Sequence, residues 1–298
     1  MNRPDQNARP DPGKGFYARF WISQIAALFL NPFVMVFSIR QAIGQLIGWA
    51  RLLTIGGVSM AAVDVRLPLQ GRWRVLNGGL TAKTSHSWGL LAQRYAYDFV
   101  RDPGDGTPPL AGWPAFGAPV LAVLAGEVVA VRDGLRDHPR PGTGWIDWRV
   151  RDPRGNYVLI RHGQGRFSLY FHLQKGSVLA VPGTHMAQGE VIGAVGNSGH
   201  STEPHLHFQI QDRRNGFTCL GLPPRFCDVT VLSGPQEGDP GLLREGQIIE
   251  AGGELPATSD RVRLSAGIAP LWVSLVTLFG LAVYLRALAR LGIWLISL

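Results

Sequence analysis

Between about residues 64 and 240, proline and glycine recur every few residues, and no segment with helical periodicity is long enough to form a helix. Short runs of β-branched and other apolar residues lie between these turn signals, which is typical of strands. The runs are 120–124, 127–131, 157–160, 167–171 and 191–195. The pattern predicts a mainly β domain, an antiparallel sheet or a partly open, barrel-like sandwich. Residues 101–116 and 133–155, rich in Pro, Gly and Asp, are predicted to be long loops that shape a groove.

Hydrophobic helices are predicted at both ends of this domain. Residues 20–39 hold no charged side chain. A segment of this length matches the ~20 apolar residues that span a bilayer, although Asn31-Pro32 would kink such a helix. Residues 41–63 are predicted to lie as an amphipathic helix on the membrane, with a second span as the alternative. Residues 267–285 are again uncharged and form the C-terminal candidate.

The expected organisation is a polar tail (1–19), a membrane-associated helical segment (20–63), a β domain (64–263) and a C-terminal membrane helix (264–298). Basic residues precede the first apolar segment and follow the last, which predicts cytoplasmic termini and a β domain on the extracytoplasmic, periplasmic side of the cell membrane. Arg40, Arg51, Arg261 and Arg263 count against this orientation. Packing of both apolar segments on a soluble core remains the alternative.

The composition limits the partners. A formal net charge of +8 suits anionic partners such as phospholipid or a cell-wall polymer. Nucleic acid is not expected, because no run of Lys and Arg and no alternation of basic with aromatic residues occurs. The two cysteines, Cys219 and Cys227, bound a short loop and are either a disulfide or two free thiols.

A His-x-His pair follows a turn rich in Gly, Asn and Ser, and leads into an apolar, β-prone run. On a strand, His205 and His207 would point to one face, and Leu206 and Phe208 to the other. Two imidazoles on one strand face suit a metal ion. Taken alone the pair is a weak signal, because most such histidines lie on the surface or in hydrogen-bonded cores.

Two further histidines, His86 and His172, also lie near aromatic residues at predicted turns or strand edges. Asp98 lies within an aromatic, strand-like run, where a carboxylate is costly unless it is paired, hydrogen-bonded or bound to a metal. A salt bridge to Arg94 or Arg101 is the alternative partner for this acid. The remaining histidines lie in loop-like or polar contexts and need no special explanation: His138, His162, His185 and His200.

The order of several motifs resembles the lysostaphin/LytM-type zinc peptidases, which cut peptides of bacterial peptidoglycan. The matching sequences begin at Gly117 (Gly-Ala-Pro-Val-Leu-Ala-Val), Gly155 (Gly-Asn-Tyr-Val-Leu-Ile-Arg-His), Leu169 (Leu-Tyr-Phe-His-Leu), Gly189 (Gly-Glu-Val-Ile-Gly-Ala-Val-Gly-Asn-Ser-Gly) and Pro204 (Pro-His-Leu-His-Phe). The resemblance covers roughly residues 64–230 and neither apolar flank.

Carried over residue by residue, the resemblance implies that His86, Asp98 and His207 bind zinc and that His172 and His205 are the catalytic histidines. One spacing departs from the family. Its usual first motif places the ligand His four residues before the ligand Asp, whereas His86 and Asp98 are twelve apart. A longer variant with Gln-Arg-Tyr-Ala-x-Asp before the acid is also similar to this sequence.

The implied chemistry is coherent. Two imidazoles and a carboxylate leave a tetrahedral zinc one open position, where a water can be activated to attack an amide carbonyl. No His-Glu-x-x-His sequence offers a glutamate base, so His172 and His205 would move the protons and stabilise the oxyanion. Which of the two does which is left open.

The leading hypothesis is a membrane-anchored zinc endopeptidase that hydrolyses peptide bonds in peptidoglycan. The main alternative is a catalytically inactive LytM-like module that binds and activates another cell-wall hydrolase, and a regulatory protein partner is possible for either. An inactive module would be expected to lack some of the metal ligands or catalytic histidines, whereas this sequence has a suitable residue at all five positions, which favours the enzyme. A third alternative, a biotin- or lipoyl-carrying domain, lacks the lysine such domains need at a hairpin tip.

Overall fold

The structure is a computed structural model that describes residues 12–54, 59–102, 104, 107–252 and 261–263 of the 298. The predicted C-terminal membrane helix, including residues 267–285, lies outside the described residues. So does most of the predicted polar tail.

The uncharged stretch 20–39 does not form one helix. Helix α1 (Lys14–Leu30) ends before Asn31, and α2 (Pro32–Thr54) begins directly after it. Pro32 has no N–H to donate into a preceding turn, and it disfavours helical backbone at the residue before it. Asn31 is accordingly extended, and its Oδ1 accepts hydrogen bonds from the N–H groups of Phe33 and Val34 at the start of α2. The predicted kink is therefore a full break, and α2 takes in most of the segment expected to form a separate surface helix.

The rest of the described chain is β structure, as predicted, with only short 3₁₀ turns besides. Its strands are β1 (Ser59–Ala61), β2 (Val63–Val65), β3 (Arg72–Asn77), β4 (Tyr97–Val100), β5 (Pro119–Leu121), β6 (Gly126–Arg132), β7 (Asn156–Arg161), β8 (Phe167–Leu173), β9 (His185–Met186), β10 (Val191–Ala194), β11 (Leu206–Gln211), β12 (Gly221–Leu222), β13 (Pro224–Phe226), β14 (Val229–Ser233), β15 (Ile248–Ala251) and β16 (Arg261–Arg263).

One large antiparallel sheet organises the domain, with the order β14-β15-β3-β4-β11-β8-β7-β6-β9 and β12 paired to β11. Strand pairs β5–β10 and β2–β13 lie off this sheet, and only the second of these is parallel. Apolar side chains from the sheet and from these pairs form the main core, which includes Val120, Phe208 and Phe226. The sheet is open, which agrees with the expected partly open sandwich.

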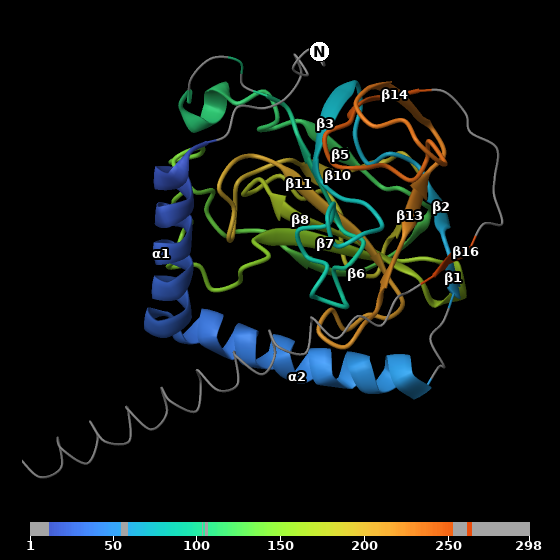
Figure 1. Cartoon of the computed structure of the whole chain (residues 1–298), viewed down its shortest axis with the longest axis horizontal. Helices are drawn as coiled ribbons and strands as arrows, with labels where there is room; N and C mark the ends of the chain where they lie inside the picture. Colours follow the sequence, from blue (N-terminus) through green and yellow to red (C-terminus); the bar gives the residue numbers. More distant parts are fainter. Residues whose placement is uncertain (1–11, 55–58, 103, 105–106, 253–260, 264–298) are drawn as a thin grey trace, which may run out of the picture.

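Helices α1 and α2 run along two sides of the β domain, which fills the angle between them (Figure 1). Trp49 and Leu52 of α2 pack in a small apolar cluster with Leu91, Tyr95 and Leu220. A side chain at Gly44 would collide with the backbone of Phe217, so this glycine allows the helix to approach closely. Helix α2 therefore packs directly against the β domain.

Both segments expected to be long loops, 101–116 and 133–155, lack strands apart from a single bridge at Asp137, and contain only turns and a short 3₁₀ segment among the described residues. Asn156, fully buried, fixes the end of the second loop. Its Oδ1 accepts from the N–H groups of Gly134 and Leu135, and its Nδ2 donates to the carbonyls of Leu135 and Leu173. Cys219 and Cys227 are free thiols, so the two-thiol alternative holds in this structure.

Candidate metal centre

Strand β11 lies between β4 and β8, and its register brings His207 directly opposite Asp98. Leu206, Phe208 and Ile210 are fully buried in the main core, while His207 faces the opposite side of the sheet. The alternation predicted for the His-x-His run is therefore present. Antiparallel pairing of two strands that are more than a hundred residues apart in sequence is what brings this acid and this imidazole together.

A compact series of turns over 81–96 carries His86 to the same place. The hydroxyl of Ser85 donates to the carbonyl of Arg94 at 2.8 Å, and that of Ser87 donates to the carbonyl of Gln93 at 2.7 Å. These bonds hold the turn that bears His86 against the segment leading into β4. The twelve-residue separation of His86 and Asp98 is thus taken up by turns, and His86 Nε2 lies 3.4 Å from Asp98 Oδ2.

His86, Asp98 and His207 each offer one ligand atom, and these atoms lie within 4.8 Å of one another. His207 Nδ1 lies 2.9 Å from Asp98 Oδ1. Ligand atoms of a tetrahedral zinc, each about 2.0–2.2 Å from the ion, are separated by about 3.3–3.5 Å. No other such His, Cys, Asp or Glu cluster is found in the described part of the chain. Donor types and spacing fit a zinc ion with a further position open.

The carboxylate of Asp98 is buried and surrounded by histidines. Burial opposes its ionisation, but His86, His207 and His205 outweigh burial and hold the pKa of this carboxyl well below its usual range. Asn77 Nδ2 donates to Asp98 Oδ2 at 2.9 Å and fixes the carboxylate plane. The alternative partner Arg101 donates instead to the backbone carbonyls of Gln70 and Arg72.

A chain of side-chain amides leads to the Nε2 side of the His207 ring. Gln211 Nε2 donates to the Arg213 carbonyl, which leaves Gln211 Oε1 to accept from Gln209 Nε2 at 2.8 Å. Gln209 Oε1 is then the acceptor that faces His207 Nε2 at 3.3 Å. Both partners of the His207 ring only accept: Gln209 Oε1 faces Nε2, and Asp98 Oδ1 faces Nδ1 at 2.9 Å. A metal that takes the lone pair of Nδ1 would leave the proton on Nε2, where Gln209 accepts it, so this surrounding is a second fit to a metal.

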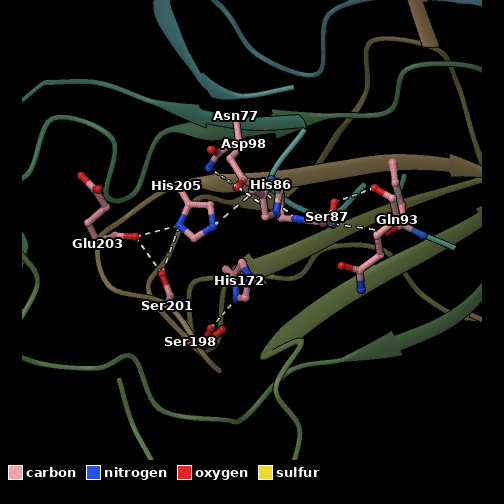
Figure 2. Close-up of polar contacts among 12 residues, drawn as sticks. Asn77, His86, Ser87, Gln93, Asp98, His172, Ser198, Ser201, Glu203 and His205 are labelled. Atoms are coloured by element: carbon pink, nitrogen blue, oxygen red, sulfur yellow. Dashed lines mark hydrogen bonds and ion pairs between the residues drawn. The ribbon is translucent and has the colours of Figure 1, made fainter. Parts of the chain in front are cut away.

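His172 and His205 lie beside this cluster, with ring centroids 4.6 Å apart, and point toward its open side (Figure 2). The Nδ1 of His172 donates to the Ser198 carbonyl at 2.8 Å, and the Nδ1 of His205 donates to the Glu203 carbonyl at 2.8 Å. Both protons are thereby held on Nδ1, and both Nε2 atoms are left as acceptors. His205 Nε2 lies 3.9 Å from Asp98 Oδ1.

His172 has a strained backbone and a perturbed imidazole. Its φ of 61° is in the left-handed region, next to an irregularity in the pairing of β7 with β8. Such strain is found where the surrounding structure over-determines a functional side chain. Burial, together with His205 and His207, holds the pKa of His172 well below its usual range, so the ring is neutral at pH 7.

All five residues predicted for the site therefore lie together. The positioning residues were not predicted: Asn77, Gln209 and the carbonyls of Ser198 and Glu203. The Gln-x-Gln pattern after His207 is the only sequence signal that pointed to one of them, since its side chains share the histidine's face. Tyr170, two residues before His172, is fully buried, and its hydroxyl accepts from the N–H of Val123.

Residues 113–218 match the model of peptidase family M23. The matched segment contains His172, His205 and His207, whereas His86 and Asp98 lie before its first residue.

Curated relatives match over the same region. Peptidoglycan DD-endopeptidase ShyA of Vibrio cholerae is 30% identical over 154 residues, which is 52% of this chain and 28% of that protein. DD-carboxypeptidase/endopeptidase Mpg of Neisseria meningitidis is 47% identical over 57 residues, 19% of this chain and 13% of the relative. The matches thus span less than a third of the length of either relative.

Among solved structures, the catalytic domain of lysostaphin from Staphylococcus simulans aligns with 51% of this chain and 88% of its own, at 20% identity and a TM-score of 0.31.

Proposed function

We propose that this chain, which contains a peptidase family M23 domain, is a zinc endopeptidase that hydrolyses peptide bonds in bacterial peptidoglycan. The observation that carries the proposal is the convergence of His86, Asp98 and His207, with two further histidines facing the open side of the cluster. Such a set leaves room for a substrate, whereas a structural zinc site is closed by four protein ligands.

In this proposal His207 binds zinc through Nδ1, His86 through Nε2 and Asp98 through its carboxylate. When bound, zinc acts as a Lewis acid that polarises the amide carbonyl and lowers the pKa of a water molecule. Asn77 and Gln209 hold Asp98 and His207 in the orientation that directs their lone pairs to a common point.

The two remaining histidines supply the proton transfers. Each has an unprotonated Nε2 and an Nδ1–H anchored on a backbone carbonyl, so each ring accepts a proton without turning. One of them takes the proton of the attacking water on Nε2 and returns it to the leaving amine, and the other, after taking up a proton from solvent on Nε2, stabilises the negative oxygen. The low pKa of His172 keeps it in the base form at neutral pH.

The substrate and the location follow from the relatives and from the charge. The relatives named as peptidoglycan endopeptidases support a cell-wall substrate and action outside the cytoplasm. The apolar helix α2, which is long and apolar enough to cross a membrane by length and composition, supports anchoring at the cell membrane. The net charge of +8 favours an anionic polymer close by.

The test is mass analysis of fragments released from purified peptidoglycan by the full chain. Zinc-loaded protein is expected to release soluble peptide-bearing fragments, and a chelator or the substitution His205→Ala is expected to lower the rate at least ~100-fold, the size of a proton-transfer contribution. His185→Ala, an exposed histidine on β9, is the matched control. No release by the zinc-loaded protein would favour the inactive regulatory module.

A further inference from the structure

Most of the large apolar side chains that are exposed among the described residues belong to α1 and α2. They are Tyr17, Trp21, Ile22, Ile25, Phe29, Leu30, Phe33, Val36, Ile43, Leu46, Ile47 and Leu53. On α2, Phe33, Val36, Ile43 and Ile47 follow the three- and four-residue spacing of one helical face. The opposite face, which includes Ala42 and Leu52, is buried against the β domain.

Helix α2 is attached to the β domain by polar contacts along its length. Gln45 Nε2 donates to the carbonyl of Gly89, and Gln45 Oε1 accepts from the N–H of Leu91. Near the end of the helix, Arg51 pairs with Asp212 at 2.5 Å. A helix that crossed a bilayer would have to give up these contacts and carry Gln45 and Arg51 into hydrocarbon, which is costly.

The loop 133–155 continues the same apolar surface beside α1. Arg19 Nε donates to the carbonyl of Thr143, and Asn31 Nδ2 donates to the carbonyls of Trp148 and Val150. Trp145 and Trp148 are exposed on this loop, at 37% and 39%. Tryptophan is enriched where protein meets the headgroup region of a membrane.

The exposed charges around this surface are basic, because Asp147 and Asp152 of the loop are buried and paired with Arg136 and Arg154. No Asp or Glu occurs from Pro12 to Val63. Arg40 is exposed on α2, and Arg149 and Arg151 are exposed on the loop, where their guanidinium groups lie over the rings of Trp148 and Phe33. Arginine beside exposed aromatic and aliphatic side chains is the composition of helices that lie in the interface of anionic membranes.

We infer that α1, α2 and the tips of Trp145 and Trp148 form one docking surface for an anionic lipid bilayer, and that α2 lies flat in the interface instead of crossing it. The inference rests on the proposed anchoring at a membrane and not on the proposed hydrolysis.

Depth measurements along α2 test the inference. Single cysteines replace exposed residues (Phe33→Cys, Val36→Cys, Ile43→Cys and Ile47→Cys) in a full chain whose own thiols are removed by Cys219→Ala and Cys227→Ala. Each is labelled with a nitroxide and reconstituted, without zinc, in vesicles of phosphatidylglycerol and phosphatidylcholine. All four labels are expected at the same shallow depth, with oxygen accessibilities within about twofold of one another. Leu232→Cys, exposed on β14, is the matched control and should stay in water.

Two outcomes would overturn the inference. A depth that increases steadily from Phe33 to Ile43 would mean that α2 crosses the bilayer. Labels that are shielded equally with and without vesicles would mean that a second copy of the chain, or its residues 264–298, covers the surface. Because zinc is absent throughout, loss of hydrolysis cannot produce either result.

Discussion

At the residue scale, the site depends on which ring nitrogen of each histidine carries the proton. Backbone carbonyls fix this for His172 and His205, and Gln209 offers the acceptor that would hold the His207 proton on Nε2 when a metal takes Nδ1. A metal ligand whose second nitrogen is anchored loses less freedom on binding and keeps its lone pair on the ion.

Gln209→Leu removes the acceptor for His207 Nε2–H while keeping similar volume. We expect zinc affinity to fall about 10- to 100-fold, as for other residues that orient a metal ligand. Competition with a chromophoric chelator measures it. Gln209→Glu keeps an acceptor at the same place and should bind zinc more tightly than the leucine variant. Gln188→Leu, an exposed amide between β9 and β10, is the control. Equal affinity in all four proteins would contradict the positioning role of Gln209.

His200, which is not one of the predicted metal ligands, is expected to make folding stability depend on pH. Burial lowers the pKa of His200 to about 4, and its buried Nε2 has no hydrogen-bond partner in the described structure. The unfolded chain takes up this proton near pH 6.5 and the folded chain only near pH 4, so folding stability falls as pH is lowered through that window. The loss is at most about 3 kcal/mol.

His200→Leu should abolish this part of the pH dependence. Urea unfolding at pH 8 and pH 5 measures it: the stability lost between the two should be smaller in the variant. An equal loss in both proteins would show that His200 does not titrate as the structure indicates.

The five site residues were predicted mainly from the resemblance to the zinc peptidases, and the cost of a carboxylate in an aromatic, strand-like run only drew attention to Asp98. The groups that hold these five residues were not predicted. Asn77, Ser198 and Glu203 act through a side-chain amide or backbone carbonyls that come close only in the folded chain, and ordinary turns contain the same residue types. The metal and catalytic roles of the five residues remain predictions.

At the scale of elements, the break between α1 and α2 depends on Asn31. Its Oδ1 caps α2 and its Nδ2 donates to two carbonyls of the loop at Trp148 and Val150. The Asn31 side chain thus caps α2 and also attaches the junction of the two helices to the β domain.

Asn31→Asp keeps the cap but loses both donors and places a carboxylate against two carbonyls. We expect local opening of this corner to become easier by about 2–4 kcal/mol. Hydrogen exchange of amides in residues 27–37 and 145–151 should then be at least tenfold faster. Asn215→Asp is the matched control, because Asn215 Oδ1 accepts from Phe217 N–H, which a carboxylate also does. Unchanged exchange at the corner would contradict its role.

Sequence periodicity predicted the strands well and the helices less well. Runs such as 157–160 and 167–171 fall inside β7 and β8, because a short apolar run between turn residues is a local signal. In the uncharged stretch 20–39 the sequence predicted a kink at Asn31-Pro32, and the structure has a full break between two helices there. Attachment of α2 to the β domain depends on Leu91 and Leu220, which are far away in sequence.

At the scale of the whole molecule, the site is a product of topology. Asp98 lies on β4, His207 on β11, and His86 in turns before β4, so these ligand atoms meet only when the central sheet has formed. A metal that binds only the folded arrangement stabilises it, by about 2.7 kcal/mol at a hundred times the dissociation constant. The central claim is therefore that this chain holds one divalent ion at a site assembled by folding.

Zinc content per chain tests that claim most directly. The purified full-length protein, equilibrated with zinc and freed of excess, is analysed beside Asp98→Ala, His207→Ala and the control His185→Ala. We predict one zinc per chain in the unaltered protein and in the control, and loss of zinc in the two site variants with the β fold retained. A metal-free unaltered protein, or full zinc content in the site variants, would contradict the account.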